Sequence, residues 1–129
     1  MNRKLLIAGS LFGILAIILG AFAAHGLKPE LSVERMQTFE TGVKYQMYNA
    51  LFLLFLGGLP VASEKVKNIC FYLTVFGVLF FSGSIYLLAT NPLTSFDFSI
   101  FGPVTPVGGL LMISAWIVLL ISFSKLKKK

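Results

Sequence analysis

The stretch from Leu5 to Ala24 reads LLIAGSLFGILAIILGAFAA and contains no charged residue. About 20 apolar residues are what an α-helix needs to cross the hydrocarbon core of a bilayer. Arg3 and Lys4 precede the run, and Ala21-Phe22-Ala23 imitates a signal-peptide cleavage site. A signal peptide has a shorter apolar region of roughly 7 to 15 residues. We therefore expect a first membrane helix that is retained.

Three further apolar runs follow, at approximately 45–62, 69–90 and 104–123. Of the 129 residues, 57% are hydrophobic and 12% are charged, and the mean hydropathy is +0.87. A soluble domain has about 25% charged residues, so these values exclude an ordinary soluble domain and a disordered chain. The sequence predicts an all-α fold, a four-transmembrane-helix bundle that forms one domain over residues 1–129.

The segment between the first two runs is polar and contains six charged residues between Lys28 and Lys44. Pro29 should break the preceding helix, and Ser32 is a suitable N-cap for the next one. Opposite Glu34 and Arg35, four apolar residues recur every three or four positions: Val33, Met36, Phe39 and Val43. This stripe predicts a short interfacial helix over Leu31 to Gly42 that lies in the headgroup region.

Small residues recur along one face of the first run, with steps of four, three, four and four. They are Gly9, Gly13, Ala16, Gly20 and Ala24. Helices in lipid associate through close packing at small residues. The stripe therefore predicts a helix contact, which we expect within the chain rather than with a second copy in a homo-oligomer.

Polar residues of the four predicted spans gather at one leaflet, the one opposite the termini. This predicted outer-leaflet polar cluster consists of His25, Gln46, Asn49, Ser82, Ser84, Tyr86 and Thr105. Polar groups in hydrocarbon need partners, so they should bond across helices or line a wet cavity. His25 either relays a proton, because its ordinary pKa lies near neutrality, or is a neutral imidazole that ties helix ends together.

The sequence lacks the residues that several classes of function require. One cysteine, Cys70, excludes an internal disulfide and a multi-thiolate metal site. No span holds two acidic residues, and no Ser has an evident base, so we expect neither an enzyme nor a bound metal or cofactor. The net charge is +6, and the basic residues lie at the ends of apolar runs. This position argues against nucleic acid as a partner and for membrane lipids.

Four motifs resemble those of a small membrane family, the domain of unknown function 423. They are GAFAAHG at 20–26, TGVKYQ at 41–46, FSGSIY at 81–86 and TPVGG at 105–109. The resemblance covers essentially the whole chain and implies a four-helix bacterial inner-membrane protein without an established activity. Two positions depart from the family pattern: Ala23 stands where relatives often have Gly, and Asn49 where they commonly have His.

Two functions are consistent with these features. The first is a non-enzymatic membrane protein that binds a small or lipidic ligand, or a partner protein, through the outer-leaflet polar cluster. The alternative is an oligomeric small transporter or channel, proton-linked through His25. A four-helix monomer is too thin to enclose a wide pathway, so the second hypothesis requires an oligomer.

The distribution of basic residues predicts the topology in the plasma membrane. With four spans, eight Lys and Arg lie on the side of the termini and only Lys28, Arg35 and Lys44 on the other. Cytoplasmic loops carry the excess of basic residues, so both termini should be cytoplasmic. An impermeant maleimide should label Ser95→Cys in intact cells and spare Lys127→Cys; labelling of the tail would contradict this topology.

Overall fold

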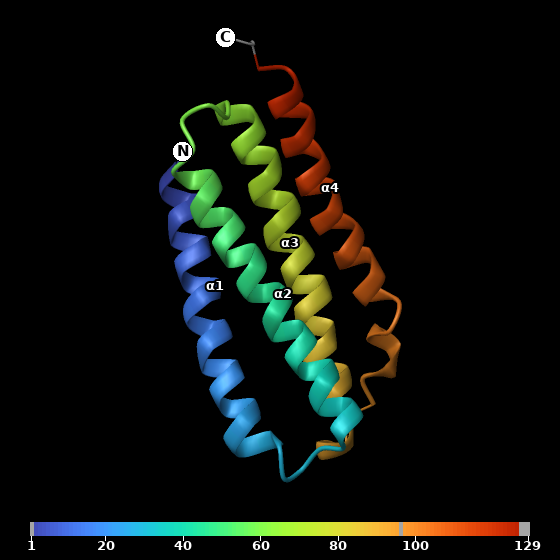
Figure 1. Cartoon of the computed structure of the whole chain (residues 1–129). Helices are drawn as coiled ribbons and strands as arrows, with labels where there is room; N and C mark the ends of the chain where they lie inside the picture. Colours follow the sequence, from blue (N-terminus) through green and yellow to red (C-terminus); the bar gives the residue numbers. More distant parts are fainter. Residues whose placement is uncertain (1, 96, 127–129) are drawn as a thin grey trace.

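The computed structural model describes residues 2–95 and 97–126, and in this part of the chain the regular elements are all helical. Four long helices run antiparallel to their chain neighbours: α1 (Asn2–Phe22), α2 (Val33–Gly57), α3 (Glu64–Ala89) and α4 (Val104–Ser124) (Figure 1). A π-helical turn, Ala23–Leu27, extends α1, and two 3-10 turns, Asn91–Leu93 and Ser99–Phe101, lie between α3 and α4. The all-α prediction is confirmed.

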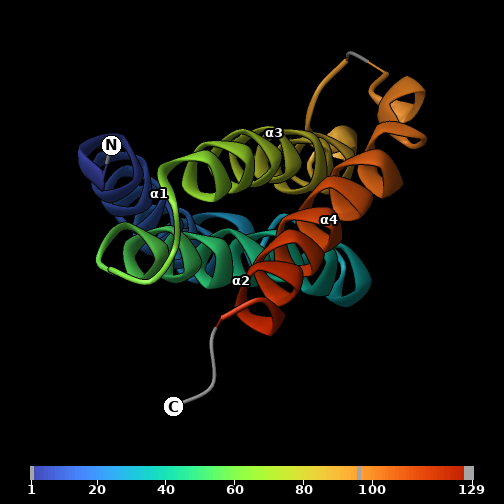
Figure 2. The same cartoon turned by 90° about the horizontal axis from the view of Figure 1, so that it is seen from above.

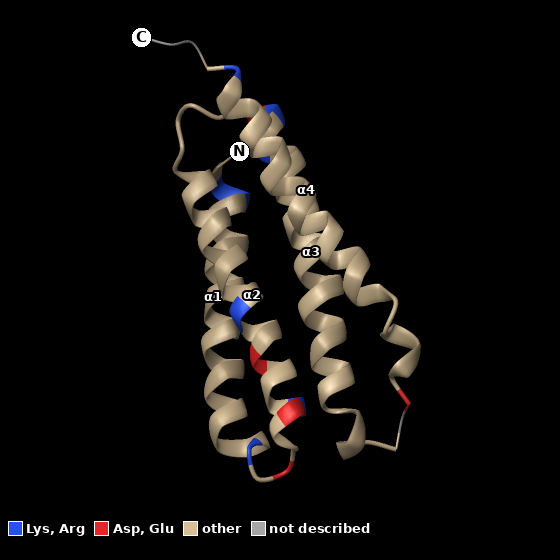
Figure 3. Ribbon diagram, turned by 45° about the vertical axis from the view of Figure 1, so that its right-hand side comes forward, with Lys and Arg blue, Asp and Glu red and all other residues tan. Residues whose placement is uncertain are grey.

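Three segments of the described chain are long and apolar enough to cross a membrane: Asn2–Leu27, Glu64–Ala89 and Ser99–Ser124. Each segment has 26 residues, and the mean hydropathies of their apolar parts are 2.6, 1.9 and 2.2. α2 is not among them, because charged residues occupy its first half (Figure 3). Hydropathy therefore supports three spans. Whether α2 is a fourth span depends on how it packs against the other helices.

The predicted interfacial helix is wrong as a separate element. Residues 33–57 form one continuous helix, and Ser32 caps it as predicted, with its Oγ accepting from the Arg35 N–H at 3.2 Å. No proline interrupts 33–57, so the helical hydrogen bonds continue into the apolar half. Phe39 is buried, but Val33 is 74% exposed, which contradicts the stripe at its first position. The Arg35 Nη1 donates to the Leu88 carbonyl at 2.8 Å and so caps the end of α3.

The small-residue face of α1 contacts α2 of the same chain, as predicted. A Cβ at Gly9 would lie 2.8 Å from the Ala50 carbonyl oxygen, and one at Gly20 would lie 3.6 Å from Val43 Cγ1. Gly13 also faces Ala50, and Ala16 is buried. Ala24 is exposed, so its inclusion was wrong. The face continues instead through Ala23 and Leu27, which are both buried and extend the three- and four-residue spacing of the buried residues Leu5, Gly9, Phe12 and Ala16.

The closest approach of two helices was not singled out from the sequence. A Cβ at Gly108 of α4 would lie 2.3 Å from the Phe81 backbone nitrogen and 2.7 Å from the Gly77 carbonyl oxygen of α3. Neither distance leaves room for a side chain. α4 packs mainly on α3 at this point, and seen from above it runs obliquely to α2 (Figure 2).

The α3–α4 loop is ordered by hydrogen bonds of its own. Asn91 Oδ1 accepts from the Phe98 N–H at 2.9 Å, and Asp97 Oδ1 accepts from the Ser99 N–H at 3.0 Å. The bonds from Ser99 lower the pKa of Asp97 from its ordinary value, because they stabilise the carboxylate. The loop therefore keeps its acidic residue ionised and at the surface.

Replacing Gly108 tests the α3–α4 contact. We expect Gly108→Ala to lower stability in detergent by about 1–3 kcal/mol, the usual cost of overpacking, because backbone atoms cannot move aside as a side chain can. Gly83→Ala is the matched control, since nothing lies within 4 Å of a Cβ at that position of α3. Thermal unfolding of the two variants measures the difference, and equal melting temperatures would contradict the close contact.

Candidate functional site

Gln46 of α2 bonds to two other helices. Its Nε2 donates to the Phe12 carbonyl of α1 at 2.9 Å, and its Oε1 accepts from the Tyr86 hydroxyl of α3 at 2.6 Å. The side chain is buried, so both bonds form away from solvent. One amide thus holds α1, α2 and α3 together.

Three hydroxyl groups form the next links. Ser82 donates to the Gly42 carbonyl of α2 at 2.7 Å. Ser84 is within hydrogen-bond distance of the Thr105 hydroxyl of α4. Ser84 is also within hydrogen-bond distance of the Phe81 carbonyl, at 3.0 Å, one turn earlier in α3. These bonds join α3 to both α2 and α4.

Asn49 lies one turn of α2 beyond Gln46 and is only 3% exposed. Its Nδ2 donates to the Tyr45 carbonyl at 2.8 Å and contacts Met112 Sδ of α4 at 3.2 Å. Its Oδ1 is buried and has no partner in the described part of the chain. Most buried polar groups in proteins do have a partner, so this carbonyl oxygen is the exception within the predicted cluster.

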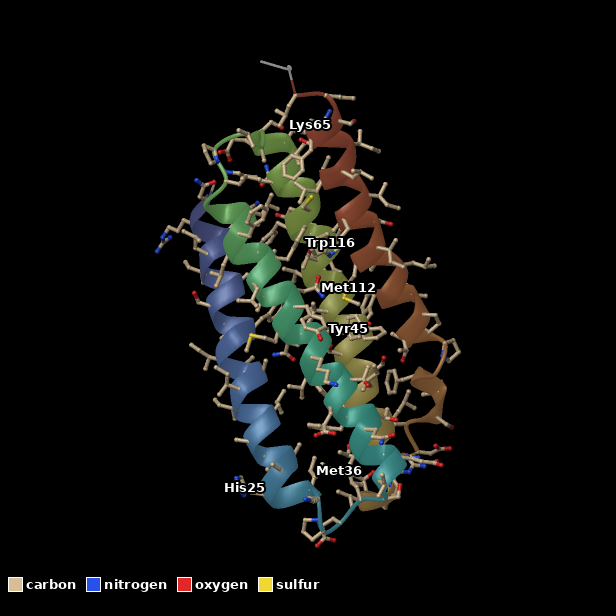
Figure 4. The ribbon with its side chains drawn as sticks, viewed as in Figure 1. His25, Met36, Tyr45, Lys65, Met112 and Trp116 are labelled. Atoms are coloured by element: carbon tan, nitrogen blue, oxygen red, sulfur yellow. The ribbon has the colours of Figure 1, made fainter. Side chains whose placement is uncertain are left out.

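His25 lies outside the cluster. It is exposed in the π-helical turn, and its side chain points away from the bundle (Figure 4). The Gln46 bond reaches α1 at Phe12, thirteen positions earlier, which is roughly 20 Å along a helix. Ala23 and Leu27 take the buried positions of this turn and leave His25 on its outer side. The expectation that His25 joins the other six residues, as a relay or as a tie between helices, was wrong.

A groove of about 1050 Å³ lies between α2 and α4, beside the hydrogen-bonded residues. Tyr45, Met112 and Trp116 lie along it near mid-height of the bundle (Figure 4). A smaller hollow of about 360 Å³ shares Tyr48, Leu51 and Trp116 with it and extends toward Phe55. Both are lined almost entirely by apolar atoms.

This groove was not predicted from the sequence. The groove exists because α4 packs on α3 and meets α2 only through side chains, such as the Phe52 and Trp116 rings, whose centroids are 4.6 Å apart. The spacing of residues within one helix does not indicate that α4 diverges from α2. Residues 2–95 and 97–126 contain no group of three or more His, Cys, Asp or Glu side chains placed to hold a metal.

Substitution of Gln46 tests the interhelical bonds. We expect Gln46→Leu to destabilise the protein by about 1–3 kcal/mol, because the half-buried Tyr86 hydroxyl loses its acceptor and the Phe12 carbonyl loses its donor. The double variant Gln46→Leu/Tyr86→Phe should lose less than the sum of the single variants, since it leaves no unpaired hydroxyl. Ser114→Ala is the control, because Ser114 bonds only within α4. Strictly additive losses in thermal unfolding would contradict the coupling.

Comparisons with known proteins identify the family. A family model described as a protein of unknown function (DUF423) matches residues 19–109. The UPF0382 membrane protein SH2409 of Staphylococcus haemolyticus is 40% identical over 123 residues, which cover 95% of this chain and 97% of that protein.

Two further relatives come from other bacteria. The UPF0382 membrane protein YwdK of Bacillus subtilis is 34% identical, with 95% and 98% of the two chains covered. The UPF0382 inner membrane protein YgdD of Escherichia coli K12 is 35% identical, with 99% and 95% covered. No solved structure matches. With relatives of this similarity along nearly its whole length, the chain is an integral membrane protein that belongs to the DUF423 family.

Proposed function

We propose that the protein is a non-enzymatic membrane protein that binds the hydrocarbon part of a lipidic ligand in the groove between α2 and α4. The groove itself is the observation that carries this proposal. Its volume of about 1050 Å³ lies just above the range of about 300–1,000 Å³ typical of small-molecule sites. Its walls are apolar, and one buried polar side chain, Asn49, lies in them.

The groove opens toward lipid if α2 crosses the membrane with its neighbours, and its packing supports this. Gly57 near one end of α2 contacts Leu6 of α1, and Gly42 in the other half contacts Tyr86 of α3. A helix packed along two spanning helices in this way lies at the same depth as they do. Four spans put both termini on the same side of the membrane, and the excess of basic residues on that side predicts that it is the cytoplasmic side.

Lys44 and Glu40 are exposed on the outer half of α2. Val43, next to Lys44, lies level with Gly20 of α1, about five to six residues beyond the midpoint of the Leu5–Ala24 run, or about 8 Å along a helix. This leaves about 7 Å to the edge of a hydrocarbon core about 30 Å thick. A lysine side chain can extend over such a distance to reach the interface. The charges are therefore compatible with a spanning α2, and they place polar groups above the outer end of the groove.

The hydrogen-bonded residues support the groove without forming the ligand site themselves. Gln46 and Tyr86 bond directly to each other at 2.6 Å, so no ligand lies between them. Their bonds hold α2 to α3, and the Ser84–Thr105 contact holds α4 to α3. Since α3 joins both groove walls, these bonds fix the spacing between α2 and α4.

The alternative function, a proton-linked transporter, relied on His25 beside the other polar residues. His25 is exposed and lies apart from them. Without His25, Tyr86 is the one titratable side chain left in the predicted outer-leaflet polar cluster. A homo-oligomer stays a prediction. The groove favours ligand binding over transport because it lies on the side of the bundle rather than along its axis.

The single tryptophan, Trp116, offers a direct test because it lines the groove and is 54% exposed. In phosphatidylcholine vesicles, a brominated fatty acid added at low mole fraction should quench Trp116 fluorescence along a saturable curve. A tryptophan that only meets bulk lipid should show weak quenching that rises linearly.

The double variant Trp116→Phe/Ile14→Trp supplies that reference, since Ile14 is similarly exposed on α1. Gly109→Leu should abolish the saturable part in a protein that keeps Trp116. Gly109 lines the groove, and a Cβ there meets only the Phe81 ring at ordinary distance. Identical linear quenching at positions 116 and 14 would overturn the proposed function.

A further inference from the structure

We propose that the groove selects a ligand that carries a phenolic ring on its apolar tail, with the phenol hydroxyl donating to Asn49 Oδ1. This inference rests on the proposed function and specifies the chemical class of the ligand. Its two observations are the unpaired amide oxygen and the aromatic walls around it.

The orientation of the Asn49 amide follows from its neighbours. The Tyr45 carbonyl oxygen lies 2.8 Å from one amide atom, and a carbonyl can only accept. That atom must therefore be the nitrogen, because two acceptor oxygens at this distance would repel each other. The oxygen is left on the other side of the amide, without a partner in the described residues. The site therefore lacks a donor, and a ligand that fits it has to supply one.

Water is a poor candidate for this donor. Asn49 lies on α2 one turn from Gln46, whose bond reaches the middle of the Leu5–Ala24 run at Phe12. At this depth of a bilayer there is no bulk water to satisfy a carbonyl oxygen. A donor delivered by an apolar molecule satisfies the amide without bringing a hydrated group into the hydrocarbon region.

Four aromatic residues around Asn49 indicate a ring rather than a plain chain. Tyr45, Tyr48, Phe81 and Trp116 all line the groove. Tyr45 meets both Tyr48 and Phe81 edge to face, with interplanar angles of 76° and 69°. Aromatic rings prefer offset or edge-to-face contacts with other rings, so these walls favour a flat aromatic group over a saturated chain of equal volume.

Met112 lines the groove together with Asn49. Its sulfur is a weak acceptor and lies 3.2 Å from Asn49 Nδ2. The Met side chain has three rotatable bonds and adapts its shape readily. Met112 can therefore adjust to a ring that enters the groove beside the amide, with only a weak contact to break.

The test measures displacement of the brominated fatty acid from wild-type protein in the same vesicles, as recovery of Trp116 fluorescence. The probes are 4-nonylphenol, 4-nonylanisole and 1-dodecanol. The anisole keeps the ring and tail but has no donor, and the alcohol keeps a donor but has no ring. We expect the phenol to displace the fatty acid at about fivefold lower mole fraction than either, in line with one buried hydrogen bond.

Asn49→Leu should remove the advantage of the phenol, so that phenol and anisole displace the fatty acid at equal mole fractions. Equal displacement by phenol and anisole in the wild type would overturn the role of Asn49, and equal displacement by dodecanol would overturn the need for a ring. Both results can be obtained only if the fatty acid quenches Trp116 along a saturable curve. That saturable quenching is the separate test of the groove itself. Failure of the ligand class is thus distinct from failure of the proposed function.

Discussion

The backbone contact between Gly77 and Gly108 determines where α4 lies, and the shape of the molecule beside it follows. At this crossing a Cβ on Gly108 would overlap the α3 backbone, at 2.3 Å from the Phe81 nitrogen. Helices in a bilayer gain little from hiding apolar surface, so the position of a helix is set by such close approaches and by polar bonds. α4 is fixed to α3 at one crossing and by the Ser84–Thr105 contact, and it diverges from α2.

The other three helices are held by a different device. Gln46 bonds to α1 and α3 at once, and Ser82 bonds to the α2 backbone at Gly42. Gly42 also has to be small, because a Cβ there would lie 2.8 Å from the Tyr86 ring. Polar bonding and small-residue packing thus occur at the same turn of α2. This coincidence explains how a helix that hydropathy excludes from the spans still packs along them.

Features that depend on one helix could be predicted from the sequence, and those that depend on how helices diverge could not. Ser32 was identified as a cap because its bond is local. Gln46, Ser82, Ser84, Tyr86 and Thr105 were grouped because topology alone brings those turns together. Ala24 was placed wrongly because the buried face continues from Gly20 at Ala23, three residues on, and not at Ala24. His25 was placed wrongly because the next buried position is Leu27, which leaves His25 on the outer side. The prediction of two separate helices within 31–62 was wrong. A change from polar to apolar composition along the chain does not require a break in the helical backbone hydrogen bonds.

The groove accepts a saturated lipid chain as readily as any other apolar molecule of the same volume. What a saturated chain cannot do is donate a hydrogen bond. Asn49 therefore determines which class of apolar ligand the groove favours, since its oxygen is unpaired where water is scarce. An apolar residue at this position would pack against Met112 without that cost. Tyr45 and Met112 contact the amide nitrogen and leave the oxygen without a partner in the described residues, which is the arrangement expected of a site that recognises a donor.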